Sequence, residues 1–196
     1  MFPFLTISII FMLVLAFFRK RSTDKQNEVQ QQFWEQENLA NSTLRQDISK
    51  LEYISIPLDK LPLSLESEAV ETIRALANQK IINLSTYTNT ELKLKYGIAN
   101  LDILSEYESN FFTLEKSLES YASELLAADR SSDAQKILEY AVAIGSDVSN
   151  IYLMLAELYK AQDHNDRLSW LIAEASKLKT LTKDSLIVKL NAICDR

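Results

Sequence analysis

The side chains that most often carry out catalysis or bind metal ions are scarce in this chain. His164 is the only histidine and Cys194 the only cysteine, so the chain lacks the four ligands of an ordinary Cys/His zinc site. Gly97 and Gly145 are the only glycines, and a phosphate-binding loop requires more. Acidic residues are abundant, but Asp163 lies in a polar turn, QDHND, and a hydrolase would need a deep pocket around acids of raised pKa. We therefore expect no catalytic or metal-binding residues, no cofactor and no enzymatic activity.

Charge and composition narrow the class of protein. Residues 1–21 contain three basic and no acidic residues, so the rest of the chain holds 18 basic and 27 acidic residues, a formal net charge of −9. A surface this acidic repels phosphate backbones, and we expect no nucleic-acid partner. Only two glycines and three prolines occur among 196 residues. Because both residue types interrupt helices and mark turns, their scarcity predicts an all-α fold.

An apolar segment without any charged residue runs from Met1 to Phe18, and the basic residues Arg19, Lys20 and Arg21 follow it. As a helix it would be roughly 26 Å long, close to the ~30 Å of a bilayer's hydrocarbon core. A cleaved signal peptide carries its basic residues before the apolar run, and a helix that packs on the core of a modest domain keeps a polar face, which this run lacks. Basic residues stay on the cytoplasmic side. We therefore predict a single-pass anchor in the cell membrane, residues 1–18, with the N-terminus outside and the C-terminal domain cytoplasmic.

Two segments without a core of their own follow the predicted anchor. Residues 19–50 combine the basic collar with a Gln- and Asn-rich stretch, which predicts a polar, partly helical stalk. Residues 51–63 contain Pro57 and Pro62, each of which favours extended geometry in the residue before it. Because this segment is also rich in Leu and Ile, we expect it to pack as a strap across the helical domain; docking of a partner is the alternative.

The rest of the sequence, residues 64–196, is predicted to form a helical domain. Apolar residues recur at helical spacing over residues 65–79, 90–98 and 102–128. The longest of these stretches predicts one continuous buried seam, made of Leu104, Tyr107, Phe111, Leu114, Leu118, Tyr121 and Leu125.

A 34-residue period relates two stretches in the C-terminal half of the sequence. Ala122 aligns with Ala156, and the polar turns DRSSD and QDHND separate two helical stretches in each copy. This period and the pattern of large and small apolar residues resemble the tetratricopeptide repeat (TPR), in which each unit is a helix, a turn and a second helix. The resemblance covers two TPR-like units, about residues 115–146 and 149–180, with the last helix as a C-terminal cap. Neither unit has the tryptophan usual early in the family's repeat, and Leu168 replaces an expected small residue.

The TPR resemblance implies a groove that binds a protein or peptide partner. The layout also looks like an uncharacterised, single-span membrane-anchored family of low-GC Gram-positive bacteria, which supplies no activity to carry over. Our first hypothesis is a non-catalytic, membrane-tethered scaffold or adaptor. The alternative is a structural or assembly subunit of a membrane complex that uses the helical domain to oligomerise. The residues that would face the groove are Lys116, Glu119, Ser123, Leu126, Asn150, Leu153, Glu157 and Lys160; we expect Lys116, Glu157 and Lys160 to contribute little to stability.

Overall fold

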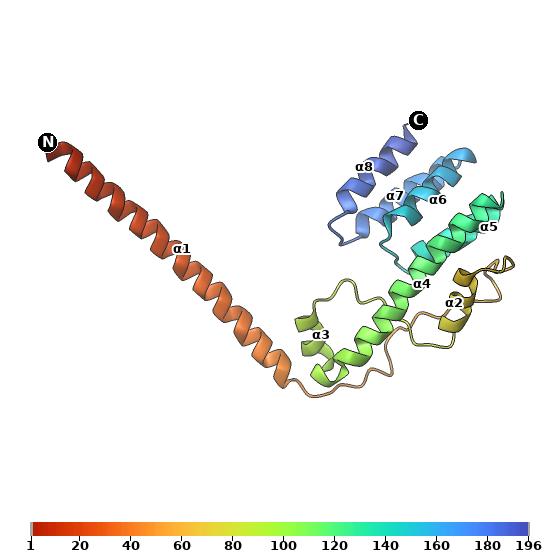
Figure 1. Ribbon diagram of the computed structural model, residues 1–196, viewed down its shortest axis with the longest axis horizontal. Coiled ribbons are helices and arrows are strands. Elements are labelled where there is room, and N and C mark those ends of the chain that lie inside the picture. Colours follow the sequence, from red (N-terminus) through yellow and green to blue (C-terminus); the bar gives the residue numbers. More distant parts are fainter. Residues whose placement is uncertain (1, 196) are drawn as a thin grey trace. The chain divides into compact units, whose positions relative to one another are not determined.

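The computed structural model describes the backbone of residues 2–195 and the side chains of residues 7–9 and 11–195. Within these residues every regular element is a helix, so the predicted all-α class is confirmed. The chain forms two compact units (Figure 1): the first comprises residues up to Ile48 together with Thr88–Leu101, and the second comprises Ser49–Tyr87 and the residues from Asp102 onward. The helices are α1 (Phe2–Ser42), α2 (Glu68–Leu76), α3 (Asn89–Tyr96), the short 3-10 helix η1 (Ile98–Asn100), α4 (Leu101–Ala127), α5 (Ser131–Ala143), α6 (Ser149–Ala161), α7 (Asn165–Lys177) and α8 (Lys183–Cys194).

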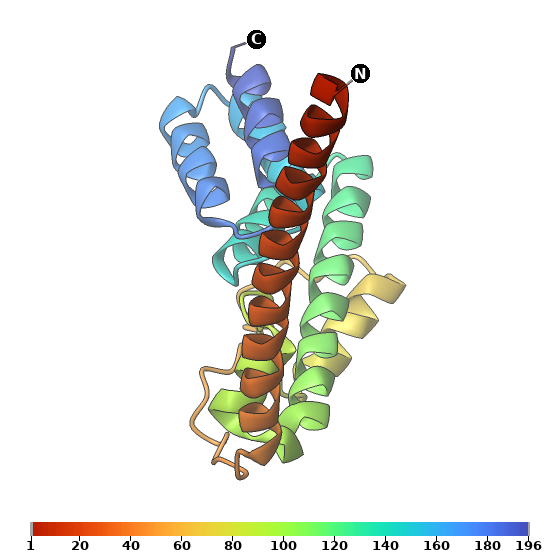
Figure 2. The ribbon, with the colours of Figure 1, turned by 90° about the vertical axis from the view of Figure 1, so that its left-hand side faces the viewer.

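The apolar run and the polar stalk belong to one helix. α1 continues without a break through 41 residues (Figure 2). The large apolar side chains described between Ile7 and Phe18 are exposed by 45% to 73%. Because they follow one another closely in a helix with about 100° between successive residues, they point to all sides of it.

Among the residues that the structure describes, no helix combines the length and the apolar character needed to cross a membrane. The predicted anchor, residues 1–18, falls partly on Met1 and on the side chains of residues 2–6 and 10, which lie outside the described residues.

In the first unit, the C-terminal end of α1 packs against α3. Ala40 is completely buried, and Glu37 forms an ion pair with Lys93. The hydroxyl of Thr90 donates a hydrogen bond to Glu37 Oε2 at 2.9 Å. The bond from the Lys93 ammonium group lowers the pKa of Glu37, because it favours the charged carboxylate.

A buried asparagine closes the loop that follows α1. Asn100 is fully buried, and its Nδ2 donates to the carbonyl oxygens of Gln46 at 2.8 Å and Tyr96 at 2.7 Å. Its Oδ1 accepts a hydrogen bond from Arg45 Nε at 3.0 Å. The side chain therefore fastens the segment after α1 to the end of α3 without leaving a polar atom unpaired.

The helix α2 is shorter than the predicted stretch, residues 65–79. The side chain of Ser67 accepts a hydrogen bond from the backbone N–H of Val70, so Ser67 caps the helix and its first turn begins at Glu68. α3 begins with a capping box, in which Thr88 and Glu91 each bind the backbone N–H of the other.

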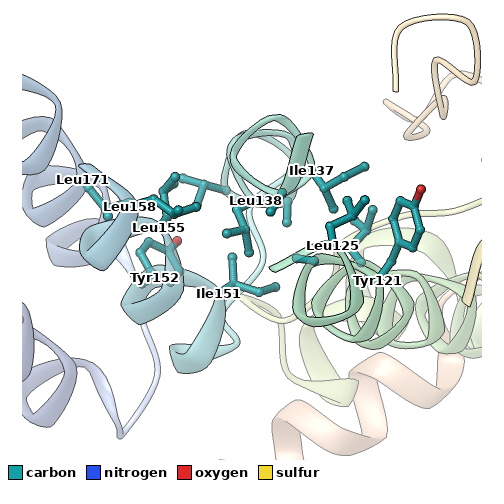
Figure 3. Packing of buried hydrophobic residues seen from close by; sticks show 14 of the residues in the cluster. Tyr121, Leu125, Ile137, Leu138, Ile151, Tyr152, Leu155, Leu158 and Leu171 are labelled. Atoms are coloured by element: carbon teal, nitrogen blue, oxygen red, sulfur yellow. The ribbon is translucent and has the colours of Figure 1, made fainter. Parts of the chain in front are cut away.

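The second unit is built on α4. Of the seven residues predicted to form its buried seam, six are buried by nine-tenths or more, and Tyr107 is half-buried. Figure 3 shows Tyr121 and Leu125 of this helix packed toward Ile137 and Leu138 of α5, with α6 beyond them. A single apolar core therefore continues from α4 through α5 and α6 to α7 and α8.

Residues 51–63 contain no helix and pack on this core. Ile56 is 7% exposed, and the backbone N–H of Ile54 donates to the carbonyl of Ile81 at 2.9 Å. Two tyrosine hydroxyls of the core hold the segment: Tyr121 donates to the Pro62 carbonyl at 2.7 Å, and Tyr140 donates to the Ser55 carbonyl at 3.2 Å.

The period found in the sequence is also present in the backbone. The helices α5 and α7 begin one period apart and also end one period apart. The C-terminal ends of α4 and α6 are separated by the same period. The turns between them are alike, since Asp129 and Asp163 have positive φ angles of 57° and 56°. The next residue bonds back in each turn: Arg130 N–H donates to the Leu125 carbonyl, and His164 N–H to the Tyr159 carbonyl, both at 2.9 Å. Residues one period apart therefore occupy equivalent places in the two helix pairs.

Candidate functional site

The eight residues predicted to line a groove lie on two helices that the structure brings together. Four are on α4 and four on α6. Asn150 Nδ2 of α6 donates a hydrogen bond to Glu119 Oε1 of α4 at 2.8 Å, and Ser123 Oγ lies 3.5 Å from the sulfur of Met154. We call the surface formed by these eight residues the repeat face: Lys116, Glu119, Ser123, Leu126, Asn150, Leu153, Glu157 and Lys160.

The helix α8 extends this surface beyond α6. It packs against both α6 and α7, and Lys160 Nζ donates to the backbone carbonyl of Cys194 at 2.9 Å. Lys160 and the Glu119–Asn150 pair therefore join neighbouring helices. The expectation that Lys160 contributes little to stability neglected this bond, which sequence spacing does not reveal.

Exposure divides the repeat face into a polar rim and an apolar floor. Lys116, Ser123 and Glu157 are exposed, whereas Leu126 and Leu153 are half-buried and pack on the core. Charges of both signs surround the two leucines. Such a surface is suited to binding another polypeptide, which can cover apolar area and pair with charges at the rim.

A hollow between α2 and α4 adds residues that the sequence did not single out. It has a volume of about 310 Å³ and is lined mainly by hydroxyl-bearing and charged side chains: Glu68, Ala69, Thr72, Thr113, Lys116, Ser117, Ser120 and Glu124. Lys116 thus lies between this hollow and the rest of the repeat face. Glu124 Oε2 is a buried oxygen without a hydrogen-bond partner among the described residues.

A buried carboxyl group lies where α4 meets the turn between α5 and α6. Glu115 is 4% exposed, and its Oε2 accepts a hydrogen bond from Ser146 Oγ at 2.9 Å. The carbonyl of Ser146 in turn accepts from the hydroxyl of Tyr152 at 2.9 Å. Burial raises the pKa of Glu115 to about 7, partly offset by the bond from Ser146, and the negative charge of Asp147 adds to the rise.

Tyr152 also lines a small, partly enclosed cavity beside this carboxyl group. The cavity has a volume of about 230 Å³, and Asn83 Nδ2 closes one side by donating to the Gly145 carbonyl at 2.8 Å. Among its charged lining residues, Lys177 and Glu174 form an ion pair with 2.6 Å between Nζ and Oε1. Because the lining comes from segments far apart in the sequence, no local pattern predicts it. The lining residues are Asn83, Ser85, Thr86, Val142, Gly145, Asp147, Tyr152, Glu174, Lys177, Leu178, Lys179 and Thr180.

The two residues considered first for chemistry lie at the ends of different helices. His164 is exposed in the turn before α7, and Cys194 is half-buried at the end of α8. Within the described part of the chain, no group of three or more His, Cys, Asp or Glu side chains is placed to hold a metal ion. The basic residues Arg19, Lys20 and Arg21 are exposed on α1, directly after the apolar run.

Comparison of this chain with models of protein families, with curated proteins and with solved structures found no match.

Proposed function

We propose that this protein is a non-catalytic, membrane-tethered scaffold that binds a protein or peptide through the repeat face. The observation that carries the proposal is the 34-residue period of the backbone, which places equivalent faces of α4 and α6 side by side. Stacked helix pairs of this kind form extended binding surfaces, because successive units present the same face in the same direction. The TPR-like assignment and the cytoplasmic location of the second unit are parts of the same proposal.

The proposed tether is residues 1–18. Its support is the charge-free sequence ending in three basic residues, together with the exposure of large apolar side chains on every side of α1. Apolar side chains so arranged are stable in a lipid environment and costly in water. From Arg21 to Glu37, where α1 meets α3, the helix covers about 24 Å, so the stalk would hold α3 at a distance from the lipid.

Site-specific photocrosslinking in native membranes tests the binding surface. A benzophenone side chain at Glu157 on the repeat face is compared with one at Ser169, another exposed position, on α7. We expect a discrete crosslinked species from position 157 and none from position 169. The species should be lost when Leu153→Asp places a charge on the apolar floor.

Two results would contradict the proposal. Equal crosslinking from both positions would mean that the repeat face is not a preferred surface. A crosslinked product containing only copies of this chain would instead favour the alternative of a structural subunit that oligomerises through its helical domain.

A further inference from the structure

One face of the polar half of α1 is not covered by any described element of its own unit. The face that carries Glu37 and Ala40 onto α3 continues toward the N-terminus at helical spacing. Its two apolar residues, Val29 and Phe33, are 66% and 52% exposed. We call this surface the stalk stripe; it consists of Ser22, Gln26, Val29, Phe33 and Gln36.

The charges around the stalk stripe indicate which kind of partner the stripe can bind. None of its five residues is charged, whereas Asp24, Glu28 and Glu35 lie on the opposite side of the helix. A shallow hollow of about 530 Å³ lies along the stripe, lined by Ser22, Lys25, Gln26, Val29, Gln30 and Phe33. A partner recognised through charge would require charged residues here, and only Lys25, at the edge, provides one.

We propose that the stalk stripe binds the same stripe of a second copy of this chain, in a parallel helix pair. In a parallel, in-register pair each residue meets its own copy, so a charged residue in the stripe would repel itself, and the stripe has none. Glutamine and serine can both donate and accept hydrogen bonds, so Gln26, Gln36 and Ser22 can pair with their own copies. Val29 and Phe33 meet their copies between these polar pairs.

The proposed contact between the two copies lies on the same face of α1 that packs against α3 nearer the C-terminal end of α1. At Glu37 and Ala40 the same face of α1 is covered by α3, so the second copy covers residues 22–36, about 21 Å of helix. A helix pair this short is weak in solution. The parallel orientation rests on the proposed anchor, because two chains anchored in one membrane share a direction and a raised local concentration.

Disulfide crosslinking of the full-length chain in native membranes tests this pairing. Single cysteines are introduced at Ser22, Val29 and Gln36 in a Cys194→Ser background, with Glu28→Cys and Glu35→Cys as controls on the opposite side. All five positions are exposed, so the substitutions leave the fold intact. After mild oxidation we expect disulfide-linked dimers to form at least tenfold faster from the three stripe positions than from the two controls.

A second pair of variants tests whether the stripe itself drives pairing. Phe33→Asp should slow crosslinking through Ser22→Cys at least tenfold, because it places two negative charges against each other. Asn27→Asp, which adds the same charge on the opposite side of α1, should leave the rate unchanged.

Three outcomes would overturn the proposal. Equal rates from stripe and control positions would show that the helices meet only by collision. Dimers from Val29→Cys but not from Ser22→Cys or Gln36→Cys would indicate antiparallel crossing. Dimers unaffected by Phe33→Asp would place the contact elsewhere. Loss of the chain from the membrane fraction would instead refute the anchor on which the parallel orientation rests, and the repeat-face crosslink at position 157 reports separately on the proposed function.

Discussion

At the residue scale, Gly97 and Gly145 differ in how much space their surroundings leave for a side chain. Both have left-handed φ angles, 84° at Gly97 and 81° at Gly145. A Cβ atom at position 97 would lie 2.5 Å from the carbonyl oxygen of Leu44, whereas at position 145 the nearest atom is the Asn83 amide nitrogen at 3.2 Å. Backbone cannot move aside as a side chain can, so only Gly97 is fixed by close approach as well as by φ.

Gly97→Ala should therefore be more damaging than Gly145→Ala. Both substitutions incur the cost of a positive φ angle, about 1–3 kcal/mol, but Gly97→Ala adds an overpacking cost of about 1–3 kcal/mol. Hydrogen exchange measures the effect locally, and we expect the amides of α3 to exchange faster in Gly97→Ala. Gly145→Ala is the matched control, and α3 exchange that is unchanged in both variants would contradict this account.

Glu115 makes stability depend on pH. Its pKa is raised in the folded state to about 7 from an ordinary value of 4.5, so the folded protein binds more protons than the unfolded chain between these values. Stability supplied by the protonated carboxyl group is present below about pH 4.5 and is lost as the pH rises through about 7. The loss is on the order of 3 kcal/mol, because each pKa unit corresponds to about 1.4 kcal/mol.

Glu115→Gln should remove this dependence, because the amide stays neutral and can still accept the bond from Ser146. The measurement is urea unfolding at pH 5 and at pH 8. We expect the variant to match the wild type at pH 5 and to be more stable at pH 8. A variant that is less stable at both pH values would mean that the charged carboxylate is the favoured form.

At the scale of elements, the two helix pairs have small residues at equivalent buried positions. Ala122 of α4 and Ala156 of α6 are one period apart in the sequence, and both are completely buried. Helices can approach closely only where side chains are short, so each alanine lies where its helix meets its neighbours.

Ala122→Leu and Ala156→Leu should each lower the free energy of unfolding by about 1–3 kcal/mol through overpacking. Ala143→Leu, at the exposed end of α5, is the matched control and should change stability by less than about 0.5 kcal/mol. Thermal unfolding followed by circular dichroism distinguishes the three. If the two buried variants melted at the temperature of the control, the equivalence of the two helix pairs would not extend to packing.

At the scale of the whole molecule, α1 joins two parts of different chemical character. Its first half bears exposed apolar side chains, and its second half bears polar residues and the contact with α3. The two halves form one helix, so whatever environment receives the first half also determines how far away α3 is held.

A chain beginning at Ser22 should leave the membrane fraction, whereas the full-length chain should remain in it after carbonate washing, because only residues 1–18 provide a long charge-free apolar segment. Orientation is tested with Ser22→Cys in a Cys194→Ser background. The predicted topology leaves Ser22→Cys unlabelled by an impermeant maleimide until the cells are opened. Labelling in intact cells would place residue 22 outside and reverse the orientation.

The sequence by itself determined the features that depend on local periodicity. The α4 seam from Leu104 to Leu125 and the period that relates the two helix pairs could be predicted because helical packing repeats every three or four residues. The equivalence of Ala122 and Ala156 follows from the same alignment. These patterns fix which residues are buried, and the sequence also placed the eight residues of the repeat face on two related helices.

Only the tertiary structure decided which distant residues meet. Burial raises the pKa of Glu115, the bond from Ser146 partly offsets the rise and the charge of Asp147 adds to it, and these two residues lie 31 and 32 positions later in the sequence. The bond from Lys160 to Cys194 spans 34 positions. Likewise, α3 groups with α1 through Glu37, 56 residues before Lys93. Such contacts depend on how whole helices pack, and a single side chain carries no local signal of its partner.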